Sequence, residues 1–95
     1  MDQKEFEIII DKAIENAPEW LLTDIEKIAE KENHFVRVSF VVSQLYQQYT
    51  SMLTHMFSSM TNDTEWYTIS YERLNFIDNN LDLIGYILHK IQKKK

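Results

Sequence analysis

The sequence predicts an all-α fold, a small helical bundle that forms a single domain over residues 1–95. Apolar residues recur at spacings of three and four through most of the chain, which is the period of an amphipathic helix. The chain also has one glycine and one proline, so it holds little material for tight turns, and a sheet-rich fold is disfavoured. A chain of this length buries roughly 60–65% of its unfolded surface, which is enough for one core without a metal or a disulfide.

The first predicted helix covers residues 2–16, where apolar side chains from Phe6 to Ile14 recur at helical spacing. Pro18 ends this helix, because proline lacks an amide hydrogen and clashes with the preceding turn. Proline is nevertheless well tolerated at the first position of a new helix.

A second, short helix therefore starts either at Pro18 or at Thr23. Thr23 is followed three residues later by Glu26, which is the spacing of a capping box and favours the later start. We expect this helix to end near residues 32–33.

Residues 35–42 are ambiguous, because they are rich in β-branched and aromatic side chains and could form a strand. Against a strand, the apolar spacing of threes and fours continues from Phe35 to Met60 without a change of phase. A strand would also need a partner, and no second run of this kind exists in the chain. The sequence therefore predicts one helix over about 33–60, roughly 42 Å long.

Residues 61–64 form the turn that we expect in the second half, with Asn62 as a helix cap. The final helix is predicted as one element over about 64–92, with two apolar stripes that require burial on two sides. Its lysines, Lys90 and 93–95, are expected to be a solvated end that complements the helix dipole. The predicted architecture is thus a long antiparallel hairpin of 33–60 and 64–92, with the two N-terminal helices packed across it.

The formal net charge of −5 argues against a general nucleic-acid binder, whose affinity comes from neutralising phosphates. The absence of cysteine excludes disulfides, thiolate zinc sites and thiol nucleophiles, and it fits a reducing compartment. The first seven residues are acidic and lack the apolar run of a secretion signal, so we expect a cytoplasmic protein.

The main anomaly is a run of 25 residues without a charge, between Arg37 and Asp63. The run is long enough to cross a membrane but too rich in serine, threonine and glutamine to do so. Small and polar residues recur along the predicted helix, opposite its apolar stripe, and we expect them to form an interface: Ser39, Ser43, Gln47, Thr50, Thr54 and Ser58.

Three interpretations of this uncharged run remain open. The helix could be the centre of the bundle, covered on all sides by its own chain. It could instead bind a second copy or another protein, since interface cores are depleted in charge. The third interpretation is a bias of composition. The first two interpretations share one expectation, which is that residues 39–58 are packed over from more than one direction.

Aromatic residues flank the predicted turn, and tyrosine and tryptophan are favoured at recognition surfaces. Their spacing is more typical of core residues, but those just after the turn could contact a partner. They could also form a pocket for a nucleotide or another anion, with an arginine supplying the positive charge. The residues that we single out for such contacts are Trp66, Tyr67, Tyr71, Arg73 and Arg37.

No metal, cofactor or catalytic site is predicted. His34, His55 and His89 lack neighbours at the spacing of metal ligands, and the chain contains no Glu-x-x-His pair. The single glycine lies inside a predicted helix, so there is no phosphate-binding loop. No serine stands beside an obvious base, and we therefore expect no enzyme activity.

These observations predict a non-enzymatic interaction module or inhibitor that binds another macromolecule, with a protein partner and homodimer formation expected. Small-ligand binding is the alternative, and an acidic mimic of nucleic acid is the third hypothesis, suggested by the ten acidic side chains in residues 1–32. A small acidic protein rich in lysine, asparagine and isoleucine also fits the products of phages or mobile elements that inhibit host machinery.

Overall fold

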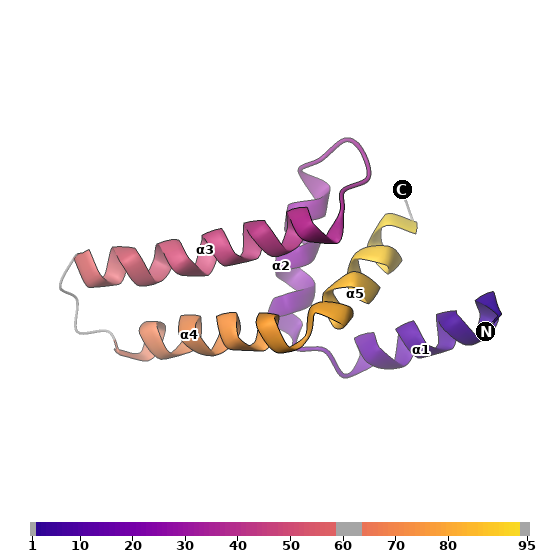
Figure 1. The fold of residues 1–95 in the computed structure, drawn as a ribbon, viewed down its shortest axis with the longest axis horizontal. Helices are drawn as coiled ribbons and strands as arrows, with labels where there is room; N and C mark the ends of the chain where they lie inside the picture. Colours follow the sequence, from indigo (N-terminus) through magenta and orange to yellow (C-terminus); the bar gives the residue numbers. More distant parts are fainter. Residues whose placement is uncertain (1, 59–63, 94–95) are drawn as a thin grey trace.

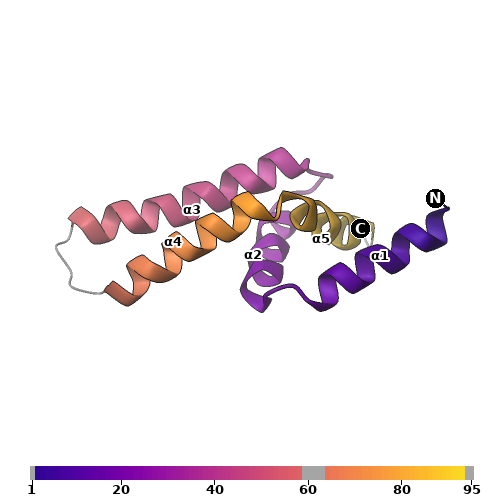
Figure 2. The ribbon, with the colours of Figure 1, turned by 60° about the horizontal axis from the view of Figure 1, so that its bottom comes forward.

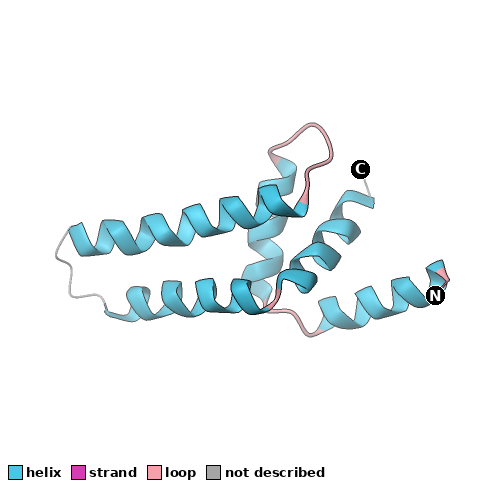
Figure 3. Cartoon of the chain, viewed as in Figure 1, coloured by secondary structure: helices cyan, strands magenta, loops and turns pink. Residues whose placement is uncertain are grey.

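The computed structural model describes residues 2–58 and 64–93, with side chains for 2–54 and 65–93. The described part of the chain is helical and contains no strand, which confirms the all-α prediction (Figure 3). The helices are α1 (Gln3–Glu15), α2 (Glu19–Glu30), α3 (Val38–Ser58), α4 (Thr64–Asn79) and α5 (Leu81–Lys93).

The two N-terminal helices follow the predicted order, but α2 starts earlier than the capping-box spacing suggested. The Asp2 side chain caps α1 by accepting a hydrogen bond of 2.8 Å from the Glu5 amide. Pro18 takes the N-cap position of α2, and its carbonyl accepts a hydrogen bond from the Leu21 amide. Because Leu21 is fully buried in the core, its burial favours the early start over a cap at Thr23.

Helix α3 begins at Val38, so the prediction of a helix from residue 33 was wrong by about one turn. Residues 33–37 are neither helix nor strand, and Val38 to Val42 are helical, which also excludes a strand over 35–42. The Gln92 side chain explains the late start. It accepts a hydrogen bond of 2.6 Å from the Val36 amide and donates one of 3.0 Å to the Val36 carbonyl. Both backbone groups of Val36 are therefore satisfied outside any helix.

The predicted helix over 64–92 is also wrong, because it is broken at Asn80 into α4 and α5. The Asn80 side chain donates a hydrogen bond of 2.9 Å to the Phe76 carbonyl, while the Asn80 carbonyl accepts from the Ile84 amide as α5 begins. Asparagine side chains compete with the helical hydrogen-bond pattern in this way. The break turns α5 toward α1, α2 and α3, where Ile84, Ile87 and Leu88 are buried.

The arrangement is a two-helix hairpin with a more compact base (Figure 1). Helices α3 and α4 run side by side in opposite directions, and α2 crosses behind their base (Figures 1 and 2). Helix α1 packs on α5, beyond the end of the hairpin, and not across it as predicted. The molecule is elongated, 52 × 28 × 17 Å. The core lies at the base, where it joins Leu21, Ile25, Ala29, Val41, Leu45, Tyr49, Ile77, Ile84, Ile87 and Leu88.

Two further predictions concern the turn and the membrane. The turn at 61–64 and its cap at Asn62 lie outside the described residues, except that α4 begins at Thr64. No helix among the described residues is long and apolar enough to cross a membrane.

Candidate interaction surface

The predicted interface residues lie on the solvent side of α3, on a surface that we call the neutral face. It consists of Ser39, Ser43, Gln47, Thr50 and Thr54, all of which are exposed. The side chain of Ser58, the sixth predicted residue, lies outside the described part. The helix has this form because its apolar stripe, Val41, Leu45 and Tyr49, recurs every four residues and is buried against the rest of the chain.

The exposure of the neutral face corrects one interpretation of the uncharged run. The interpretation in which its own chain covers α3 on all sides was wrong, because α2, α4 and α5 pack on α3 but leave the side of the neutral face in solvent. The opposite side meets solvent without an ionised side chain from Val38 to Thr54. A helix surface in water normally carries lysine and glutamate, as α1 and α2 do here.

A hollow of about 520 Å³, which we call the apolar depression, adjoins the neutral face at the start of α3. Leu81, at the start of α5, is 46% exposed at its edge, and Val38 is 37% exposed. Two serines of the neutral face lie on its rim, so the two surfaces are continuous. The residues that line it are Val38, Ser39, Val42, Ser43, Tyr46 and Leu81.

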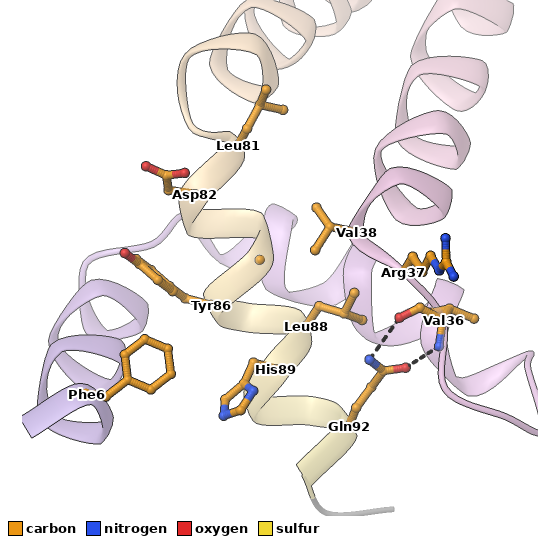
Figure 4. A pocket seen from close by; sticks show the side chains of 11 residues that line it. Phe6, Val36, Arg37, Val38, Leu81, Asp82, Tyr86, Leu88, His89 and Gln92 are labelled. Carbon is orange, nitrogen blue, oxygen red and sulfur yellow. Dashed lines mark hydrogen bonds between the residues drawn. The ribbon is translucent and has the colours of Figure 1, made fainter. Parts of the chain in front are cut away.

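A larger groove of about 690 Å³ runs along α5, between α1 and the segment before α3 (Figure 4). Val38 and Leu81 line this α5 groove as well as the apolar depression. At its α1 side, the Phe6 ring packs edge-on against His89, with ring centroids 5.7 Å apart. The hydrogen bonds between Gln92 and Val36 close its other side (Figure 4). The groove is thus open, mainly apolar and built from three helices.

Ion pairs on the surface attach α1 to the end of α5. Lys93 bonds to Glu7, and Lys90 bonds to Asp11 at 2.6 Å. The hydrogen bond from Lys93 lowers the pKa of the Glu7 carboxyl, and the hydrogen bond to Asp11 raises the pKa of Lys90. These two lysines are therefore paired with α1, whereas the sequence had suggested a solvated end; residues 94–95 lie outside the described part.

A polar and aromatic network joins α2, α3 and α4 where the hairpin leaves the core. The Arg73 guanidinium carbon lies 4.9 Å from the centre of the Trp20 ring and 5.5 Å from that of Tyr49. Arg73 Nη1 donates a hydrogen bond of 3.0 Å to the Tyr49 hydroxyl, which in turn donates to Asp24. Burial and the bond to Asp24 raise the pKa of Tyr49 to about 12, against the opposing effect of Arg73.

The five residues predicted to contact a ligand or partner do not come together. Trp66, Tyr67 and Tyr71 are exposed on α4, and their exposed fractions are 47%, 50% and 62%. Arg73 lies on a different side of α4 and is engaged by Trp20 and Tyr49. Arg37 is exposed at the start of α3, at the other end of the hairpin from the start of α4 (Figure 1).

Sequence reasoning missed the apolar depression and the α5 groove. Leu81 and Gly85 belong to what the sequence presents as one continuous helix, and only the break at Asn80 turns them beside the start of α3. Within the described residues, no three acidic or histidine side chains come together in a way that could hold a metal ion. We found no match of the chain to a protein-family model, to a curated protein or to a solved structure.

Proposed function

We propose that this protein is a non-enzymatic interaction module that acts as a homodimer, binding another copy or protein through the neutral face and the apolar depression. The observation that carries the proposal is the exposed side of α3, which lacks ionised side chains and continues into an apolar hollow. Exposed surfaces of this kind, depleted in charge and rimmed by polar groups, are typical of protein interfaces.

The charge distribution supports a second copy as the partner. The chain carries a net charge of −5, so two copies repel each other on average. In a two-fold dimer, a residue near the axis faces its own counterpart, and any charge there meets a like charge. The neutral face avoids this repulsion, because no described residue on it is ionised.

The small-ligand alternative receives no specific support. It requires an arginine beside exposed aromatic rings, but the guanidinium of Arg73 is enclosed by Trp20 and Tyr49 and bonded to the Tyr49 hydroxyl. Arg37 directly precedes α3, at the other end of the hairpin from the start of α4, where Trp66 and Tyr67 lie. A cytoplasmic location is part of the proposal and is supported by the absence of cysteine. An origin in a phage or mobile element, with inhibition of a host protein, rests on composition.

Sedimentation of the wild-type chain and of two matched variants tests the proposal. Thr50→Glu places a charge on the neutral face, and Thr23→Glu places the same charge on an exposed position of α2. Like charges brought together at an interface cost several kcal/mol, so Thr50→Glu should raise the dimer Kd at least about tenfold. Thr23→Glu should leave it unchanged. A monomeric wild-type chain at high micromolar concentration, or equal effects of both variants, would contradict the proposal.

A further inference from the structure

We infer that two copies pair in opposite directions through the front faces of their α3–α4 hairpins, with Tyr67 and Tyr71 of each copy covering the apolar depression of the other. The front face is the side of the hairpin that points away from α2. This inference rests on the proposed homodimer and specifies its geometry and contacts.

The position of Arg73 shows which way the tyrosines point. Arg73 and Phe76 face Trp20 of α2, with the Phe76 and Trp20 ring centroids 5.8 Å apart. At 100° per residue, Tyr71 lies about 160° around α4 from Arg73, and Tyr67 shares its side one turn earlier. Both rings are therefore presented on the front face, where half or more of each side chain is in water.

The apolar depression lies at the opposite end of the same hairpin. Its lining comes from α3 and the start of α5 and includes no residue of α2, which lies behind the hairpin (Figure 1). Helix α3 has 21 residues, so the depression near Val38 and the start of α4 are about 30 Å apart along the hairpin. A two-fold axis across the middle of the front face reverses the hairpin, so the tyrosines of each copy come level with the depression of the other, one helix away, and reach it with their side chains. Both contacts form together.

Charge favours the antiparallel direction over the parallel one. Arg37 is exposed at the base of the hairpin, and Glu65 is exposed in the first turn of α4. Antiparallel pairing brings Arg37 of one copy toward Glu65 of the other, whereas parallel pairing brings each charge toward its own counterpart. Between these two ends, α3 contributes no ionised side chain, and α4 contributes Asp78, which is exposed on the same side as Tyr71. Electrostatic complementarity of this kind fixes the register of an interface.

The front face is large enough for a stable dimer. Two helices side by side, about 30 Å long and each about 10 Å wide, offer on the order of 600 Å² per copy. The two copies together would bury roughly 1,200 Å², which lies at the lower limit of specific protein interfaces. The depression and the two tyrosine rings supply the apolar part of that area, as interface cores require.

Because the chain has no cysteine, single engineered cysteines can map the pairing directly. The two-fold axis of the antiparallel dimer passes the middle of α3, near residue 48. Residue 50 then lies about 6 Å along the helix from residue 50 of the other copy, and residue 39 lies about 27 Å from residue 39 of the other copy. The experiment treats Thr50→Cys, Ser39→Cys, Glu65→Cys and an equal mixture of the last two with a short bismaleimide. Sedimentation of each variant reports its mass.

Antiparallel pairing predicts that Thr50→Cys links to itself and that Ser39→Cys and Glu65→Cys link only when they are mixed. A dimer in which Ser39→Cys links efficiently to itself is parallel and overturns the inference. A dimer in which the mixture fails to link also overturns it, while the proposed self-association stands. A monomeric chain overturns both, so the two failures are distinguishable.

Discussion

The hydroxyl of Tyr49 offers a quantitative test of how the hairpin is anchored. Tyr49→Phe removes the group that accepts a hydrogen bond from Arg73 and donates one to Asp24, at a position that is only 1% exposed. Each hydrogen bond contributes about 0.5–1.5 kcal/mol, and more when a partner is charged. We therefore expect the free energy of unfolding to fall by about 2 kcal/mol near pH 8.

The same hydroxyl should make this loss depend on pH. The pKa of Tyr49 is about 12 in the folded chain and 10 as its ordinary value, so the unfolded chain releases the proton first as pH rises. Deprotonation of the unfolded state then removes stability from the wild-type chain between about pH 10 and 12. A difference of two pK units corresponds to about 2.7 kcal/mol at most.

Urea denaturation followed by circular dichroism, from pH 8 to 11.5, measures both effects. The difference in unfolding free energy between wild type and Tyr49→Phe should shrink as pH rises above 10, because the wild type loses the stability that the variant lacks. Tyr86→Phe, on α5 and outside the front face, is the matched control and should follow the wild type throughout. A difference that stays constant across this range would refute the assignment of the raised pKa to Tyr49.

Three further outcomes are expected. Ser70→Ala should leave stability unchanged or raise it by about 1 kcal/mol in urea denaturation, because the buried Ser70 hydroxyl has no hydrogen-bond partner within the described residues. Gly85→Ala should raise the free energy of unfolding by about 0.5–1 kcal/mol, seen as a higher thermal unfolding midpoint, since the added Cβ would lie 3.6 Å from Val38, an ordinary contact. At about 1 M salt, where the Debye length is roughly 3 Å, hydrogen exchange of α1 should accelerate relative to that of α2. The reason is that ion pairs of Lys90 and Lys93 attach α1 to α5, and salt screens them. Equal acceleration of the two helices would count against this role of the ion pairs.

Helical periodicity was sufficient to predict the all-α class, because the apolar stripe through Val41, Leu45 and Tyr49 is a local pattern that burial then uses directly. It placed the ends of α1 to within about one residue, where Asp2 supplies a local cap. It failed at Val36 and Asn80. The backbone of Val36 bonds to a side chain 56 residues away, and the Asn80 side chain takes the Phe76 carbonyl that the Asn80 amide would bond in a continuous helix. The periodicity of apolar residues does not predict such contacts.

The candidate surface also has one part that the local sequence pattern determines and one part that depends on contacts between distant residues. The neutral face could be predicted, because it depends on one helix and on residue types alone. The apolar depression could not, because Leu81 meets Val38 and Tyr46 only after the chain turns at Asn80. The residues predicted to contact a ligand are kept apart for a related reason: Tyr71 and Arg73 are close in sequence but lie on opposite sides of α4.

The network around Arg73 also marks where the third layer of the molecule ends. Beyond Tyr49 on α3, and before Ser70 on α4, no described side chain is fully buried. Within the described residues, this outer part of the hairpin is two helices thick and has no fully buried side chain, so its backbone hydrogen bonds should open at a lower free energy than those of the base. Any protein that lies along the front face would supply the missing layer, and association would then appear as stiffening of the arm and not only as a gain in mass.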